Sequence, residues 1–187
     1  MMKSLNDFSN WYFNEISMHA KKLDLVNFEL FLCSLARCRD LNSTVYFVGN
    51  GGSSAIVAHC AVDYENVLGI TVNTMESVSL HTCYSNDYGY QHGHERWLSK
   101  RLRPNDLLVC VSSSGQSKNV LNALEVASKV GCKSVAFTGF DSKNGANSLA
   151  DQFFWVDSTV YNIIENVHQI WLLLACDHLK NHGRPNA

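Results

Sequence analysis

The chain has 187 residues, 46% of them hydrophobic and 17% charged, and its 15 basic and 17 acidic residues leave a net charge of -2. Its length fits one domain with a substantial core, and this charge gives no sign of a nucleic-acid-binding surface. No apolar run reaches the roughly 18 residues of a membrane span, and the first residues lack the features of a signal peptide. With seven dispersed cysteines and no CxxC pair, we expect a cytoplasmic protein with reduced thiols.

Two segments near the N-terminus have helical periodicity, Leu5 to about Ala20 and about Leu25 to Cys38. Both are apolar around much of their circumference, which is more than one surface helix of a monomer needs. We therefore predict a helical hairpin within residues 1–40 that packs on an α/β core of residues 41–182 and on a second subunit. Packing within one chain explains the pattern equally well.

A strand, a glycine-rich turn and a helix come next. The run Thr44–Val48 has the β-branched and aromatic composition of a buried strand. It ends at Gly49-Asn50-Gly51-Gly52, and a helix follows from Ser53 to about Tyr64. Glycines allow a tight turn and close approach of a ligand, and the free amides at a helix start attract anions. This turn predicts a phosphate or other anion site, although a tight turn without a ligand has the same pattern.

A second turn of this kind follows the apolar run Asp106–Val111. Residues 112–117 read Ser-Ser-Ser-Gly-Gln-Ser, and a helix with apolar positions from Val120 to Ala127 comes after them. Four hydroxyls around one glycine can donate several hydrogen bonds to phosphate oxygens, and the helix dipole favours the negative charge. A serine-rich loop that caps its helix would use only one or two of them.

The other segments alternate between strand and helix patterns, which predicts a doubly wound parallel α/β sheet with its ligand at the C-terminal ends of the strands. They are a strand at Gly69–Val72, a helix at Thr74–Cys83, a turn at Ser85–Tyr90, a helix near His92–Arg101, a strand at Cys132–Thr138, a loop and short helix at Gly139–Ser148, an edge strand at Phe153–Val156 and a helix at about Asn162–Lys180.

Several short motifs resemble the sugar isomerase (SIS) domain family, in the branch of the phosphoheptose isomerases and the DnaA initiator-associating proteins. They are GNGGS at 49–53, His59, SNDYGY at 85–90, SSSGQSKN at 112–119, AFTG at 136–139 and ENVH at 165–168. The resemblance spans nearly all of residues 1–187 as a single SIS domain. It implies a flavodoxin-like, five-stranded sheet, a homotetramer with sites at subunit interfaces, and a phosphorylated sugar as ligand.

The resemblance also implies roles for individual residues. The sugar would be contacted by Asn50, Gly51, Gly52 and Ser53, its hydroxyls also by Asp87, and the phosphate by Ser112, Ser113, Ser114 and Ser117.

The chain departs from the isomerase pattern where that pattern places its catalytic groups. A glutamate is expected four residues after His59, but this chain has Asp63. Aspartate is one methylene shorter, and a misplacement of ~1 Å can cost ~10²-fold in rate. At the position of the family's glutamine this chain has Glu165, and at that of the catalytic histidine it has Leu173. Just before the last helix, where the family has an acidic residue, this chain has Asn162. Leucine can neither transfer a proton nor bind a metal.

The remaining candidates for proton transfer are His59, Asp63 and Glu165. Some family members bind Zn²⁺ at the corresponding positions, so these three side chains could form a metal site with nitrogen and oxygen ligands. Alternatively, His59 and Asp63 are hydrogen-bonded across one helical turn.

Other histidines could compensate for the missing one. The pair His92 and His94 could present an imidazole to the site, but such a pair at the start of an exposed helix is more often solvated. His168, in the ENVH motif, fits a buried and hydrogen-bonded helix histidine better than a catalytic one.

Three functional hypotheses follow. The first is an aldose–ketose isomerase that acts on sedoheptulose 7-phosphate, or a related sugar phosphate, in surface-polysaccharide (heptose) precursor synthesis. The second, favoured by Leu173 and Asp63, is a non-catalytic sugar-phosphate sensor or an adaptor of the DnaA-associating type. The third is a subunit of a mixed assembly in which another chain supplies the missing base.

Overall fold

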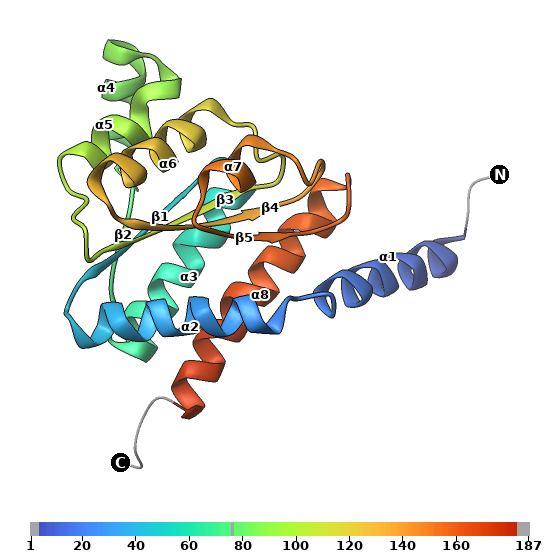
Figure 1. Ribbon diagram of the computed structural model, residues 1–187. Helices are drawn as coiled ribbons and strands as arrows, with labels where there is room; N and C mark the ends of the chain where they lie inside the picture. Colours follow the sequence, from blue (N-terminus) through green and yellow to red (C-terminus); the bar gives the residue numbers. More distant parts are fainter. Residues whose placement is uncertain (1–3, 76, 183–187) are drawn as a thin grey trace.

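A five-stranded sheet lies between two layers of helices in the computed structural model, which describes residues 4–75 and 77–182 (Figure 1). The strands are β1 (Thr44–Gly49), β2 (Thr71–Thr74), β3 (Leu107–Ser112), β4 (Lys133–Thr138) and β5 (Gln152–Trp155). All four pairings are parallel, in the order β2-β1-β3-β4-β5. This is the flavodoxin-like order, which confirms the predicted doubly wound α/β fold and places the crevice where the order reverses, between β1 and β3.

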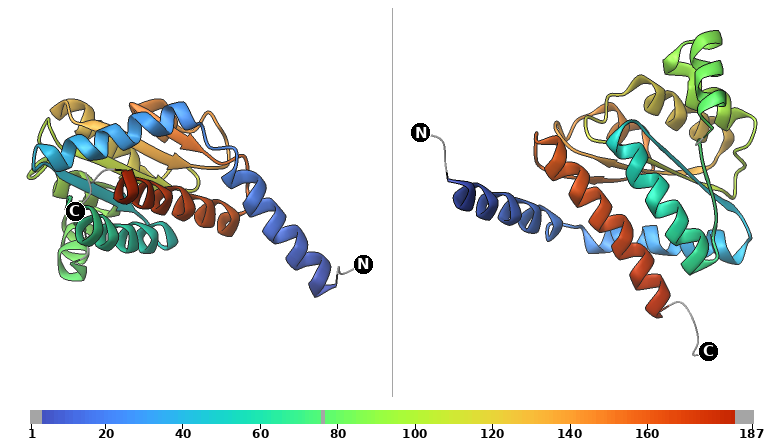
Figure 2. Two further views of the ribbon diagram at one scale, coloured as in Figure 1. Left: turned by 90° about the horizontal axis from the view of Figure 1, so that it is seen from below. Right: turned by 180° about the vertical axis from the view of Figure 1, so that it is seen from behind.

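Helices cover both faces of the sheet. They are α1 (Leu5–Ala20), α2 (Leu25–Asp40), α3 (Gly52–Leu68), α4 (Val78–Tyr88), the 3₁₀ helix η1 (Tyr90–His92), α5 (Gly93–Ser99), α6 (Lys118–Val130), α7 (Gly145–Leu149) and α8 (Tyr161–His182). One face carries α2, α3 and α8, with α3 and α8 side by side, and the other carries α5, α6 and α7 (Figure 2). Within the described ranges, none of the helices has the length and apolar character needed to cross a bilayer.

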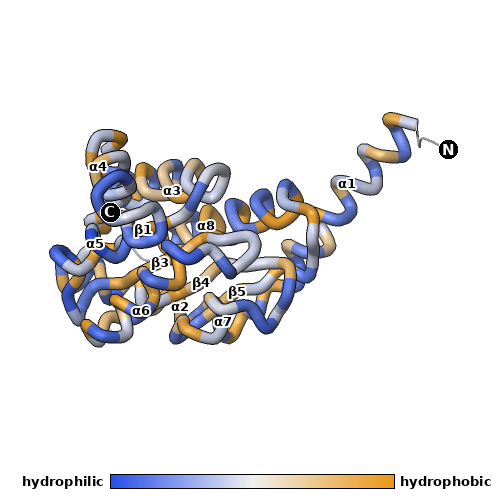
Figure 3. Tube along the Cα trace, turned by 90° about the horizontal axis from the view of Figure 1, so that it is seen from above, coloured by the Kyte–Doolittle hydropathy of each residue, from blue (hydrophilic) through white to orange (hydrophobic). Residues whose placement is uncertain are grey.

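Side chains of β3 alternate between two apolar clusters. Leu107, Val109 and Val111 pack with α2, α3 and α8, whereas Leu108 and Cys110 pack with α5 and α6. A strand buried on both faces needs apolar residues at every position, and Figure 3 shows the apolar segments running through the sheet and the helices against it. The core therefore fixes the sheet and leaves its C-terminal edge free for polar turns.

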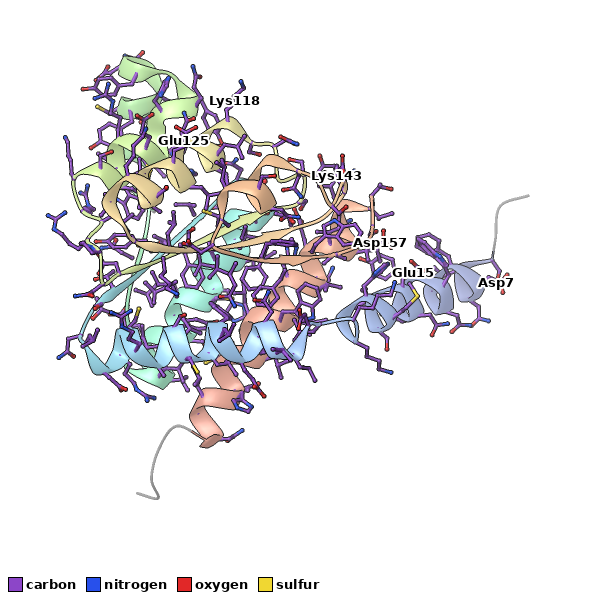
Figure 4. The ribbon with its side chains drawn as sticks, viewed as in Figure 1. Asp7, Glu15, Lys118, Glu125, Lys143 and Asp157 are labelled. Carbon is purple, nitrogen blue, oxygen red and sulfur yellow. The ribbon has the colours of Figure 1, made fainter. Side chains whose placement is uncertain are left out.

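The two N-terminal helices form within the predicted bounds, but α1 points away from the body instead of folding back along α2. Asp7, near the start of α1, accordingly stands apart from the rest of the chain (Figure 4). The second half of α1 is anchored on α8 and the core: Ile16 packs against the core, His19 is buried, and Trp171 Nε1 donates a hydrogen bond to Ala20 O over 2.9 Å.

Two other segments differ from the prediction. The strand expected from Gly69 starts at Thr71, because Gly69 ends α3 in the left-handed region with φ 67°. The helix expected to end at Cys83 begins later and runs through Tyr88, so Asp87 lies in α4 rather than in a turn.

Candidate functional site

Two turns line one cavity at the C-terminal edge of the sheet. They are the glycine turn, residues 49–52, and the serine turn, residues 112–117. Their strands are neighbours, and Gly49 pairs in register with Val111, so both turns leave the sheet side by side. A cavity of about 120 Å³ separates them. It is lined by Asn50, Ser53, Val111, Ser112, Ser113, Ser114, Ser117, Tyr161 and Glu165. The site therefore lies where the strand order reverses, as expected for ligands of this fold.

In the glycine turn, Gly51 is required by its backbone conformation and Gly49 by space, because a Cβ there would lie 2.9 Å from the backbone of Ser53. Gly51 has φ 52°, a conformation that side chains rarely adopt. A Cβ on Gly52 would collide with the carboxylate of Glu165. Gly51 is the N-cap of α3 and makes no side-chain cap hydrogen bond. The carboxylate of Glu165 and the positive end of α3 thus meet at one wall of the cavity.

The side chain of Asn50 is held by two residues to which the sequence assigned no role. Asn50 Nδ2 donates to Asn119 Oδ1 over 3.0 Å, and Asn119 Nδ2 donates to Asn50 Oδ1 over 2.7 Å. Tyr90 Oη also donates to Asn50 Oδ1, over 2.7 Å. Asn119 is 2% exposed. The sequence pointed to them only as members of motifs: Tyr90 belongs to the motif at 85–90, and Asn119 to the motif at 112–119.

The serine turn presents hydroxyls and amides to the cavity. Gln116 N donates to Ser114 Oγ over 3.2 Å, and Ser112 Oγ lies 3.5 Å from Ser117 Oγ. Ser113 Oγ is buried and has no hydrogen-bond partner among the residues that the structure describes. Ser117 precedes α6 and its side chain does not cap the helix. Buried hydroxyls usually have partners, so this turn has spare donors for an anion's oxygens.

Glu165 contributes a carboxyl group to the cavity wall. It is half-buried at the start of α8, and burial raises the pKa of its carboxyl. A carboxyl with a raised pKa exchanges protons more readily near neutral pH, which suits a general acid or base.

His59 and Asp63 contact each other on α3, whereas the carboxylate of Glu165 lies against Gly52. His59 Nε2 is 3.6 Å from Asp63 Oδ2, and Gln169 Nε2 is 3.2 Å from His59 Nδ1. Gln169 comes four residues after Glu165 and four before Leu173, a spacing that places all three on one face of α8. Leu173 packs against the apolar core. Gln169 is a contact of His59 that the sequence did not indicate.

The three proposed metal ligands do not form a set within one chain. In residues 4–75 and 77–182, no three His, Cys, Asp or Glu side chains are placed to hold a metal ion. His59 and Asp63 contact each other, while Glu165 lies against Gly52. Within the described residues of one chain, His59, Asp63 and Glu165 are therefore not gathered into one ligand set.

The other candidate residues lie outside this cavity. His92 Nδ1 is 2.7 Å from Glu95 Oε2 and is partly exposed, but His94 is buried, so the expectation of a solvated pair is wrong for His94. His168 is fully buried, and its Nε2 lies 2.9 Å from Thr138 O, which matches the favoured structural role. Asp87 is exposed on α4 and is hydrogen-bonded by Asn86 and Cys83.

The cysteines near the motifs are not activated as nucleophiles. All seven cysteines are free thiols. Burial, followed by the charge of Asp63, raises the pKa of Cys60 to about 12. The hydrogen bond to Asp87 raises the pKa of the exposed Cys83. A thiol needs a lowered pKa to be reactive at neutral pH, so the geometry favours hydroxyl, amide and carboxylate chemistry.

A parallel sheet with two polar strand-to-helix turns at its switch point defines a flavodoxin-like α/β protein whose candidate ligand site lies between those turns. Residues 14–139 match the profile described as SIS domain, and the chain therefore belongs to the SIS domain family.

Relatives place it near the phosphoheptose isomerase branch. Phosphoheptose isomerase from Akkermansia muciniphila is 36% identical over 145 residues, which cover 71% of this chain and 73% of that protein. The structure of phosphoheptose isomerase GmhA from Neisseria gonorrhoeae matches with a TM-score of 0.86 and 25% identity, over 94% of this chain and 99% of that one. The Vibrio vulnificus NanR protein, complexed with ManNAc-6P, shares the fold with a TM-score of 0.75 and 17% identity, over 97% of this chain and 64% of that one.

Proposed function

We propose that this chain binds a phosphorylated sugar, with the phosphate in the serine turn and the sugar against the glycine turn. The observation that carries the proposal is the single cavity that both turns line. Hydroxyls and free amides bind phosphate oxygens, and the names of the relatives supply the substrate class. Isothermal titration calorimetry with sedoheptulose 7-phosphate tests it, and a flat titration at millimolar ligand would contradict it.

The reaction we propose is aldose–ketose isomerisation of sedoheptulose 7-phosphate or a related sugar phosphate, in the synthesis of heptose precursors for surface polysaccharides. A base removes the proton from the carbon next to the carbonyl, an enediol forms, and the proton returns to the neighbouring carbon. Glu165 is our candidate base because it lies in the cavity wall with a raised pKa. His59 and Asp63 are the candidates for moving the second proton, between the two oxygens.

The reaction has a direct test. The protein is incubated with sedoheptulose 7-phosphate in D₂O, with and without added Zn²⁺, and NMR spectroscopy follows the substrate protons and any new aldose phosphate. We expect deuterium at the carbon next to the carbonyl and the appearance of an aldose. Binding without exchange or product in either condition would reject the isomerase.

That negative result is the outcome of a second candidate function, a sensor or adaptor that binds the sugar phosphate without converting it. Its specific support is Leu173, a partly buried core residue at the position of the family's catalytic histidine. NanR, whose structure holds ManNAc-6P, has the same fold. A protein with this fold can therefore serve to bind a sugar phosphate without converting it.

We propose a cytoplasmic homotetramer with sites at its subunit interfaces. Apolar side chains on α1 are exposed in the single chain, among them Phe8 at 51% and Phe13 at 66%. Exposed apolar surface of this kind marks protein interfaces. Light scattering of the purified protein should give four times the mass of the chain. A stable tetramer with full activity alone would exclude a mixed assembly with a second chain.

A further inference from the structure

Two asparagine side chains connect the glycine turn to the helix that follows the serine turn. Asn50 belongs to the glycine turn, and Asn119 is the second residue of α6. Asn50 Nδ2 donates to Asn119 Oδ1 over 3.0 Å, and Asn119 Nδ2 donates back to Asn50 Oδ1 over 2.7 Å. In residues 4–75 and 77–182, these two hydrogen bonds are the ones that join the glycine turn to residues 112–119 beyond the ladder of β1 and β3.

Asn119 is the fixed member of this amide pair. It is 2% exposed and lies in the first turn of a helix. Its backbone also makes a hydrogen bond with the imidazole of the buried His94. Asn119 is not among the residues that line the cavity between the two turns. It can therefore act on a ligand in that cavity only through a neighbour.

Asn50 is the member of the pair that reaches the cavity. It is partly exposed, stands between Gly49 and Gly51, and lines the cavity together with Glu165. A free asparagine side chain at such a place would rotate about two bonds. Ordering a side chain when a ligand binds reduces the affinity, and a side chain that the protein already holds in place avoids this cost.

Tyr90 holds the same amide from a third element. Its hydroxyl donates to Asn50 Oδ1 over 2.7 Å, from the helix η1. Asn50 Oδ1 thus accepts two hydrogen bonds, which is the capacity of a carbonyl oxygen. One of the two N–H groups of the same amide is used by Asn119. The other N–H group is left for an oxygen of the ligand.

We propose that Asn119 and Tyr90 are positioning residues, which hold the amide of Asn50 so that its remaining N–H group meets an oxygen of the bound sugar. This inference rests on the proposed function for the ligand. It adds two residues that act on the ligand through Asn50, and it gives the buried amide of Asn119 a role in the site.

A double-mutant cycle tests whether Asn119 acts through Asn50. NMR titration with sedoheptulose 7-phosphate, up to millimolar dissociation constants, compares wild type, Asn119→Ala, Asn50→Ala and the double variant. Asn119→Ala should weaken binding about threefold to tenfold, as expected when one more side chain must be ordered on binding. In the Asn50→Ala background the same substitution should have no further effect. A general loosening of α6 would instead weaken binding equally in both backgrounds.

A second variant removes only the tyrosine hydroxyl. Tyr90 is 50% exposed, so Tyr90→Phe should fold normally, as circular dichroism can verify. It should weaken sedoheptulose 7-phosphate about twofold to fivefold, while the affinity for inorganic phosphate, which contacts the serine turn alone, stays the same. The matched control is Tyr88→Phe, on an exposed tyrosine of α4, which should change neither affinity.

The outcomes separate this inference from the proposed function. Wild-type affinity in Asn119→Ala or in Tyr90→Phe would overturn the inference for that residue, and so would an equal loss in the Asn50→Ala background. Both results leave the proposed function intact. If Asn119→Ala does not fold, the same cycle run with Tyr90→Phe decides. If wild-type protein binds phosphate but no sedoheptulose 7-phosphate, the proposed function fails and the inference fails with it.

Discussion

The serine turn and the seam between α3 and α8, which holds Glu165 and the His59–Asp63 pair, are built differently. The turn is set by backbone contacts: Gly139 N donates to Ser113 O, and Ala146 N donates to Gly115 O, each over 2.9 Å. The seam depends on side chains, and that of His59 is 51% exposed. The proposed anion site is therefore preformed by the backbone, whereas the proposed proton transfer would depend on a few substitutable side chains. Such a protein can lose a reaction and keep its ligand.

The largest effect is expected on turnover, from a substitution of Glu165 in the seam. Glu165→Gln removes the candidate base without changing the size of the side chain. We expect kcat for sedoheptulose 7-phosphate to fall about 10²–10⁴-fold, the usual contribution of a general base, with binding nearly unchanged. The matched control is Glu125→Gln, an exposed residue of α6 (Figure 4). Unaltered turnover in Glu165→Gln would remove this residue from the reaction.

The next effect falls on the serine turn. Ser114→Ala removes a hydroxyl from the cavity wall, and with it the acceptor of Gln116 N, while the backbone hydrogen bonds from Gly139 N and Ala146 N remain. A hydrogen bond to a charged group contributes about 1.5–3 kcal/mol, so sugar-phosphate affinity should fall roughly 10-fold to 100-fold. Calorimetry measures it, with Ser128→Ala on the exposed side of α6 as the control. Equal affinity in both variants would place the phosphate elsewhere.

The third prediction concerns the pH dependence of stability, which we expect to come from the buried His168. Burial lowers the pKa of His168 to about 4, whereas an unfolded chain has a histidine pKa of about 6.5. The unfolded state therefore binds the extra proton between these values, and stability is lost as pH falls through this window. On the order of 2 kcal/mol should be lost by pH 5.

Urea unfolding at several pH values measures this loss. His168→Gln can still donate a hydrogen bond to Thr138 O but does not titrate, so its stability should fall less steeply below pH 6.5 than that of wild type. Parallel pH curves for the two proteins would mean that His168 is not buried in the neutral form.

The smallest effect is expected for the exposed pair of the seam. His59→Ala should change the free energy of unfolding by less than about 1 kcal/mol, because exposed ion pairs contribute little. Chemical denaturation checks this. If His59 has a role in proton transfer, kcat should fall in the same variant although stability does not. A large loss of stability would instead make the pair structural.

The fold was largely predictable because strands β1, β3 and β4 each contain a run of apolar residues that is buried on both faces of the sheet. The edge strand β2 has only four residues and none of them is buried, so its local signal is weak. The orientation of α1 was not predictable because its periodicity shows which residues are apolar, not what covers them.

The two turns of the site were predictable for a related reason. Each is a local strand–turn–helix pattern, and the parallel sheet brings neighbouring C-terminal ends together. Contacts between distant segments were not predictable: Gly52 with Glu165, Asn50 with Asn119, and the burial of His94 all depend on how helices pack. Residue spacing on one helix also could not show that Glu165 lies apart from the His59–Asp63 pair.

The most direct measurement of the central claim follows backbone amide NMR shifts while sedoheptulose 7-phosphate is added. If the two turns hold one ligand, amides in 50–53 and in 113–117 should shift together and yield the same dissociation constant. Shifts confined to one turn, or to neither, would contradict a shared sugar-phosphate site.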